Sequence, residues 1–176
     1  IDLAKPLKSG EKITFSIKWW YNIVNYQEQA NNGRSGYEQF KDGNRLYVMA
    51  QFFPRMAVYD DIMGWNTLPY LGPGEFYLEY GDVVANITVP SNHYVVASGE
   101  LLNQNEVYSK EQIKKWEQAK NSEKTVVIRS ADEVNQAAKN VNGTKTWKFK
   151  IQNTRDFAWA SSSAFILDAA RINLPS

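Results

Sequence analysis

Residues 81–101 read GDVVANITVPSNHYVVASGEL, and this stretch decides the fold class of the chain. Two runs rich in Val, Ile, Tyr and Thr, at 83–89 and 93–98, are separated by the turn-forming tripeptide Pro90-Ser91-Asn92. Short runs of β-branched and aromatic residues that are bounded by turn residues are typical of β-strands. The stretch therefore predicts two consecutive strands joined by a turn.

Comparable short runs lie on both sides of this stretch. In EKITFSIKWW, residues 11–20, large apolar side chains at every second position from Ile13 to Trp19 alternate with polar ones, which predicts a half-buried strand. The segment 54–74 contains three prolines and three glycines and has little periodicity, which predicts a long packed loop. Further strands are predicted at 36–43, 45–53, 75–81, 125–129, 145–151, 156–160 and 164–168.

Two short helices are predicted from their N-terminal capping signals. Ser109 is followed three residues later by Gln112, which is the pattern of a capping box and predicts a helix over 109–120. Ser130, with acidic residues shortly after it, predicts a second short helix over 131–139. Together these elements predict a single mainly β domain over residues 1–176, built of antiparallel twisted sheets or a β-sandwich with two short helices.

The composition of the 176 residues excludes several classes of function. The net charge of +1 argues against a nucleic-acid-binding protein, and no apolar run is long enough for a transmembrane segment. The absence of cysteine excludes disulfide scaffolds, cysteine nucleophiles and cysteine-ligated metal sites. His93 is the only histidine, whereas catalytic zinc sites usually need two or three. We therefore expect no catalytic residue, no metal ligands and no cofactor in this chain.

Aromatic residues are the one compositional excess, with 6 Trp, 10 Tyr and 8 Phe. Strand alternation places Trp19, Trp147 and Trp159 in the predicted core, whereas Trp65 lies in the irregular segment and is the best candidate for an exposed aromatic. Sugar-binding β-sandwich modules stack pyranose rings on Trp and Tyr side chains. One alternative is therefore a carbohydrate- or protein-binding module with an aromatic platform.

Three blocks of the sequence carry a resemblance to a known family. They are AQFFPRMAVYDDIMGWN at 50–66, GEFYLEYGDVVANITVPSNHYVVASGEL at 74–101 and RDFAWASS at 155–162. In this order they resemble the N-terminal domain of zinc aminopeptidases of the aminopeptidase N and leukotriene hydrolase family, the gluzincins, in their bacterial branch. The resemblance covers most of the chain.

This resemblance implies a saddle-like, non-catalytic β domain excised from a larger hydrolase, a zinc metallopeptidase whose catalytic domain is absent here. In such an enzyme the domain packs on its own downstream catalytic domain, closes one side of the cleft and helps to select the peptide substrate. The zinc of the parent enzyme belongs to the catalytic domain, where it activates the attacking water. We also expect a periplasmic or secreted location.

One substrate-contacting residue carries over from the resemblance. The family places a T-Q-x-E or T-Q-x-Q element at the rim of its active site, and Gln51 matches the Gln of this element. Ala50 departs from the Thr, and Phe53 replaces the last polar residue. The replacement removes a group that would bind the α-ammonium of a substrate, which puts strict aminopeptidase specificity in doubt. Alternatively, Gln51 is an ordinary polar residue at a strand end.

An interdomain interface is predicted over residues 62–76. Its large apolar residues, among them Trp65, Tyr70 and Leu71, are too many for a freely solvated loop, while its prolines and glycines prevent regular burial in a strand. At the other end of the chain, Arg155 is expected to pair with a carboxylate, so that Arg155 and Asp156 stabilise the end of the domain.

Overall fold

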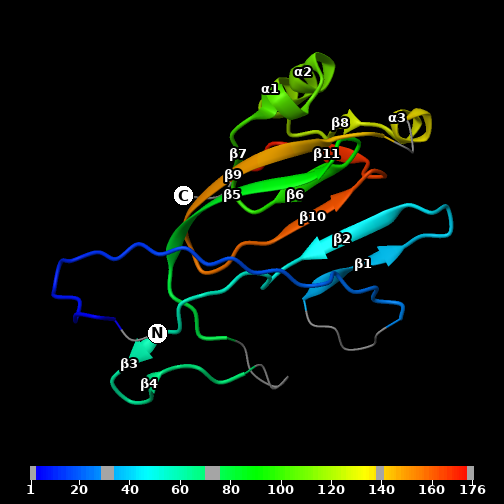
Figure 1. Cartoon of the computed structure of the whole chain (residues 1–176). Helices are drawn as coiled ribbons and strands as arrows, with labels where there is room; N and C mark the ends of the chain where they lie inside the picture. Colours follow the sequence, from blue (N-terminus) through cyan, green and yellow to red (C-terminus); the bar gives the residue numbers. More distant parts are fainter. Residues whose placement is uncertain (1–2, 29–33, 70–75, 138–140, 174–176) are drawn as a thin grey trace.

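The computed structural model describes residues 3–28, 34–69, 76–137 and 141–173 (Figure 1). Strands make up 34% of the structure and helices 13%, which confirms a mainly β fold with short helices. The strands are β1 (Ser35–Gln39), β2 (Arg45–Met49), β3 (Tyr59–Asp60), β4 (Gly64–Trp65), β5 (Gly81–Pro90), β6 (Tyr94–Ala97), β7 (Glu100–Leu101), β8 (Val126–Arg129), β9 (Thr144–Thr154), β10 (Trp159–Ser162) and β11 (Leu167–Ala169). The helices are α1 (Gln104–Val107), α2 (Lys110–Ala119) and α3 (Ala131–Gln136).

Two antiparallel sheets contain most of the strand residues. One has the strand order β1-β2-β10-β6, and the other has the order β5-β9-β7. The longest pairing joins β5 to β9, with partners from Gly81 opposite Thr154 to Pro90 opposite Thr144. Two smaller sheets, β3-β4 and β8-β11, lie at opposite ends of the molecule (Figure 1).

The turn predicted at Pro90 to Asn92 links the two main sheets. The backbone N–H of His93 donates to the carbonyl oxygen of Pro90 over 2.9 Å, so the chain reverses directly after β5. β6 then pairs with β10 rather than with β5. Two strands that are consecutive in the sequence therefore belong to different sheets, which a reading of local pattern alone does not reveal.

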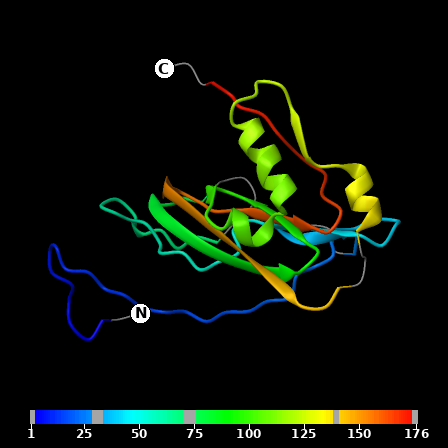
Figure 2. The same cartoon turned by 90° about the horizontal axis from the view of Figure 1, so that it is seen from above.

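The hydrophobic core forms where residues of both main sheets meet the end of α1. Trp147 and Phe149 of β9 are buried together with Ile87 of β5 and Val95 of β6. Ile151 packs against the same cluster, so the predicted alternation of apolar residues along β9 is confirmed. The long β5–β9 ribbon turns one apolar face toward the core, and α1 and α2 lie beside it (Figure 2).

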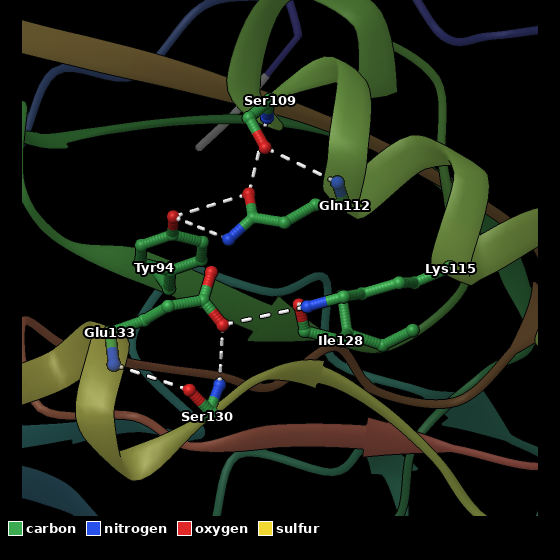
Figure 3. Close-up of polar contacts among 7 residues, drawn as sticks. All are labelled: Tyr94, Ser109, Gln112, Lys115, Ile128, Ser130 and Glu133. Atoms are coloured by element: carbon green, nitrogen blue, oxygen red, sulfur yellow. Dashed lines mark hydrogen bonds and ion pairs between the residues drawn. The ribbon is translucent and has the colours of Figure 1, made fainter.

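Both predicted helix starts are confirmed, and each has a complete capping box. The hydroxyl of Ser109 accepts from the backbone N–H of Gln112, and the Gln112 side chain accepts from the N–H of Ser109. Ser130 and Glu133 make the same reciprocal pair at α3 (Figure 3). α3 ends at Gln136, and the last two residues predicted for it lie outside the described residues. The sequence analysis missed α1, because its four residues have no side-chain cap.

The prediction of a strand over 11–20 is wrong. The segment has no regular secondary structure, pairs with no strand that the structure describes, and all of its side chains are exposed. Trp19, predicted in the core, is 49% exposed, and its Nε1 donates to the carbonyl oxygen of Phe52 over 3.1 Å. Alternation shows that one face of a segment can be buried, whereas a strand also requires a hydrogen-bonded neighbour.

Several other predicted boundaries differ from the structure. β2 ends at Met49 rather than at residue 53, because Gln51 adopts a left-handed backbone conformation that stops the strand. Residues 76–80 form no strand, and β10 begins at Trp159, which is partly buried against the core as predicted. The predicted loop over 54–74 contains the two-residue strands β3 and β4, and part of it lies outside the described residues.

Candidate functional site

A groove of about 360 Å³ opens next to the end of β2. Four segments that are distant in the sequence line it: the link after β2, the residues following β4, the segment before β5 and the loop before β10. The lining residues that matter most here are Gln51, Phe53, Arg55, Leu68, Tyr77 and Asp156. We call this hollow the Gln51 groove.

Gln51, the predicted substrate-contacting residue, lies at the wall of this groove with its side chain exposed. Its φ of 52° is in the left-handed region, which residues other than glycine rarely adopt. The preceding residue is held in place, since the Ser35 hydroxyl donates to the Ala50 carbonyl oxygen over 2.7 Å. Phe52 and Phe53, which follow, pack against the core, whereas Gln51 itself is exposed.

An ion pair joins two distant segments in the groove wall. Arg55 Nη1 lies 3.3 Å from Asp156 Oδ1, and Arg55 Nη2 donates to the carbonyl oxygen of Glu79 over 3.1 Å. The guanidinium also lies over the ring of Phe53, 5.4 Å from its centroid. Asp156 Oδ1 further accepts from the N–H of Phe157 over 2.8 Å. Arg55 thus ties the link after β2 to the loops before β5 and before β10.

The expected pairing of Arg155 with a carboxylate is wrong. The exposed Arg155 guanidinium lies over the ring of Tyr80, 4.8 Å from its centroid, and forms no ion pair that the structure describes. Asp156 forms an ion pair with Arg55 instead. Sequence analysis missed Arg55 because its partner is 101 residues away, although both residues lie in the blocks that carry the family resemblance.

Large apolar side chains of the groove wall and of the β3–β4 hairpin that follows it in the chain are exposed to solvent. Ile62 is 87% exposed, Leu68 73% and Trp65 59%, so the prediction that Trp65 is exposed is confirmed. Tyr70 and Leu71, the other two predicted interface residues, lie outside the described residues. We call the exposed apolar group the apolar rim; its members are Met56, Tyr59, Ile62, Met63, Trp65 and Leu68.

Asp60 organises the β3–β4 hairpin that carries much of the apolar rim. Its Oδ1 accepts from the N–H groups of Met63 over 2.7 Å and Ile62 over 3.1 Å, and its Oδ2 accepts from Asn66 Nδ2 over 2.8 Å. These hydrogen bonds, that of Met63 first, lower the pKa of the Asp60 carboxyl. The carboxylate therefore holds the turn in one conformation and keeps Ile62 and Met63 directed outward.

His93, the one histidine, lies in the turn between the main sheets. A hydrogen bond of 2.9 Å joins its Nδ1 to Oγ of Ser161 in β10, and Ser161 is almost fully buried. The His93 ring also lies near that of Tyr47, with the centroids 5.9 Å apart. A buried serine is poorly placed to attack a substrate, so this contact is best understood as a link between the turn and β10.

We expect the stability of the domain to fall as the pH drops below 6.5, in part because of His93. Burial lowers the pKa of His93 from its ordinary value of 6.5, so the folded state favours the neutral ring. The contribution is complete above the unfolded pKa and is lost as the pH falls from there toward the folded pKa. Urea unfolding at about pH 8 and about pH 5.5 measures this loss. The His93→Gln variant should lose less unfolding free energy between these two pH values. If the variant loses as much as the wild type, His93 does not contribute to the pH dependence.

Metal-binding side chains do not gather in the part of the chain that the structure describes. There, no group of three or more His, Cys, Asp or Glu residues is placed to hold a metal ion, so these residues do not fit a zinc site. No helix among them is long and apolar enough to cross a membrane.

No family model, curated protein or solved structure matches this chain. The function must therefore be inferred from the Gln51 groove and the apolar rim of this chain.

Proposed function

We propose that this chain is the non-catalytic β domain of a zinc aminopeptidase-like metallopeptidase, and that its apolar rim docks on the catalytic domain. In the complete enzyme the Gln51 groove then forms one side of the cleft that receives the peptide substrate. The observation that carries this proposal is the exposed apolar rim directly beside a groove that contains Gln51.

The spatial meeting of the sequence blocks supports the proposal. The first and third blocks that carry the resemblance lie about a hundred residues apart, yet Arg55 of the first pairs with Asp156 of the third. The ring centroid of Phe52 likewise lies 6.5 Å from that of Phe157 and 6.2 Å from that of Trp159. Residues of the first and third blocks are thus in contact here, as expected if the blocks that carry the resemblance form one surface.

The exposure of the rim supports a docking role. Monomeric proteins rarely leave contiguous apolar patches larger than a few hundred Å² in water, and larger ones usually mark interaction surfaces. The hydrogen bonds of Asp60 hold Ile62 and Met63 outward, so their exposure is built into the hairpin. A surface that is held open in this way is suited to bury its apolar area against a second domain.

Gln51 has the chemistry for a role at the substrate end of the cleft. Its amide can donate to a peptide carbonyl and accept from a peptide N–H or an ammonium group. The residues that the structure describes do not fit a zinc site, so zinc and the residues that bind it are assigned to the catalytic domain. A periplasmic or secreted location forms part of the same proposal.

The proposal is tested by comparing this chain with a longer protein that includes the region encoded after Ser176. That region should encode an H-E-x-x-H motif. The backbone amides of residues 56–69 should exchange with deuterium more slowly in the longer protein, because docking removes them from water. Amides of β8, at the far end of the molecule, should exchange equally in both proteins. Equal exchange at 56–69, or the absence of the motif, would refute the proposal.

Matched substitutions separate docking from folding. Leu68→Ser should lower the peptidase activity of the longer protein by about tenfold or more, as expected when a hot-spot contact of about 1.4 kcal/mol is lost. Ile166→Ser removes a comparably exposed apolar side chain far from the groove and should leave activity unchanged. Gln51→Ala should raise KM with little effect on stability. If Leu68→Ser and Ile166→Ser behave alike, the rim is not the docking surface.

Tyr59 and Trp65 favour a second candidate, a carbohydrate-binding module. Both rings are exposed, and their centroids lie 5.1 Å apart with an interplanar angle of 68°. An exposed Trp ring can stack on a sugar ring. Saturable quenching of tryptophan fluorescence by soluble oligosaccharides that disappears in Trp65→Ala would favour this candidate over docking.

A further inference from the structure

A second hollow, of about 550 Å³, lies at the opposite end of the molecule from the Gln51 groove. It is formed by the N-terminal end of α2, the end of α1, the end of β8, α3 with its C-terminal end, the start of β9 and Tyr94 of β6. Figure 3 shows Tyr94 between the capping boxes of the two helices. We call this hollow the Tyr94 pocket, and nothing in the docking proposal uses it.

Two cations share the ring of Tyr94 in this pocket. The guanidinium carbon of Arg129 lies 4.3 Å from the ring centroid, and Lys145 Nζ lies 5.6 Å from it. Arg129 is only 3% exposed and Lys145 is partly buried, so the first charge is largely, and the second partly, removed from water. Like charges in this position repel, and a protein normally places a carboxylate between them.

No carboxylate of the described residues forms an ion pair with either cation. Arg129 Nη1 donates to the carbonyl oxygens of Ser163 over 2.9 Å and Phe165 over 2.8 Å, and Lys145 Nζ donates to that of Val107 over 3.1 Å. These neutral acceptors orient the two side chains but do not balance their charge. Burial, and then the charge of Arg129, accordingly lower the pKa of Lys145.

The two carboxylates that line the pocket have other partners. Glu133 accepts from the N–H of Ser130 over 2.8 Å and lies 3.6 Å from Lys115 Nζ, where it caps α3 (Figure 3). At this position it acts on Arg129 through its field without forming an ion pair with it. Glu106 accepts from Asn103 Nδ2 over 2.8 Å and pairs with Lys148 over 3.1 Å.

The pocket also supplies neutral hydrogen-bonding groups close to the cations. Gln112, which is 4% exposed, donates from Nε2 to the Tyr94 hydroxyl over 3.0 Å. Its Oε1 accepts from the N–H of Ser109, so the amide orientation is fixed by the capping box. The Tyr94 hydroxyl donates in turn to Gln112 Oε1 over 3.3 Å, so the two side chains hold each other at the pocket wall.

We propose that the Tyr94 pocket binds an oxyanion, the carboxylate or phosphate group of a ligand, between Arg129 and Lys145. An anion there would form charge-assisted hydrogen bonds with both cations, which are the strongest polar contacts available in a partly buried site. It would also offset the repulsion between them. Both cations lie within 6 Å of the centroid of the Tyr94 ring.

The test is a titration of the whole chain with inorganic phosphate and, in a parallel arm, with acetate, at low ionic strength. The amide NMR signals of residues around Tyr94, Ser109 and Arg129 should shift, and the shifts should reach a plateau as the anion concentration rises. Phosphate binding alone would identify a phosphate site, and binding of both anions a general oxyanion site. Sodium chloride at equal ionic strength is the control. Shifts that chloride reproduces, or that do not saturate, would overturn the proposal.

Substitutions make the test specific to the two cations. Lys145→Gln should weaken anion binding about tenfold or more, as expected for the loss of a charge-assisted hydrogen bond. Lys150→Gln, on the same strand but exposed, should leave binding unchanged. Because Arg129 also supports two carbonyl groups, its substitution is expected to disturb folding, so the outcome rests on Lys145. Equal affinity in wild type and Lys145→Gln would refute the site.

The pH dependence gives an independent readout. A bound anion stabilises the charged form of Lys145 and should raise its pKa, as followed by NMR of the lysine side chain. By linkage, the affinity should fall as the pH rises through the pKa of Lys145, which lies below its ordinary value of 10.5. The carboxyl groups of the pocket, Glu106 and Glu133, have lowered pKa values, and burial raises the pKa of the Tyr108 hydroxyl to about 12, so these groups do not titrate in this range. A pKa of Lys145 that does not respond to a saturating anion would contradict the proposal.

Discussion

Replacing Trp147 with alanine is expected to destabilise the domain by about 3–5 kcal/mol, a large part of the total stability of a typical domain. Trp147 is 0% exposed, and its ring centroid lies 5.3 Å from that of Tyr108 and 5.8 Å from that of Tyr94. The pairing of β9 with β5 limits how far the backbone can collapse, so a cavity would remain. Urea unfolding followed by circular dichroism measures the loss.

Trp20→Ala is the matched control for this substitution. Trp20 is 88% exposed, so its removal should change the free energy of unfolding by no more than about 0.5 kcal/mol. The two variants delete the same side chain and differ only in its surroundings. Comparable losses from both would show that Trp147 is not at the centre of the core.

Gly99→Ala is expected to destabilise the domain by about 3 kcal/mol or more. Gly99 has a φ of 86°, which an alanine adopts only with strain. A Cβ at this position would lie 2.7 Å from Cβ of Ile151 and in contact with the backbone carbonyl oxygen of Lys150, which is fixed in β9. Accommodating it would displace β7 from β9. Thermal or urea unfolding checks the size of the effect.

Gly43→Ala separates backbone strain from this steric clash. Gly43 has a similar φ of 84°, but a Cβ there would meet nothing within 4 Å. We therefore expect only the conformational cost of about 1–2 kcal/mol. If Gly99→Ala costs no more than Gly43→Ala, the close approach of β9 to Gly99 is not rigid.

Local signals predicted most of the elements near the centre of the chain. The capping boxes of α2 and α3 were readable because the hydrogen bonds of Ser109 and Ser130 reach only three residues along the chain. The strands β5 and β9 were readable because their apolar residues alternate and one face is buried. The same criterion failed for residues 11–20, where alternation was present but no strand among the described residues pairs with the segment.

The candidate sites were only partly predictable. Gln51 and Trp65 were identified from the family resemblance and from composition, and the structure places Gln51 in the groove and Trp65 on its apolar rim. The ion pair of Arg55 with Asp156 was not predicted. Nor was the position of Arg129 and Lys145 beside the ring of Tyr94. Each of these contacts joins residues that no local spacing relates.

The sequence by itself determined the mainly β class, the starts of two helices and the apolar face of the long strands. These properties depend mainly on side chains within a few residues of one another. Only the tertiary structure decided that β5 pairs with β9, that β6 pairs with β10, and that two cations meet at Tyr94. Such contacts form when distant segments are brought together by burial of the core, because each gains its free energy from a partner far along the chain.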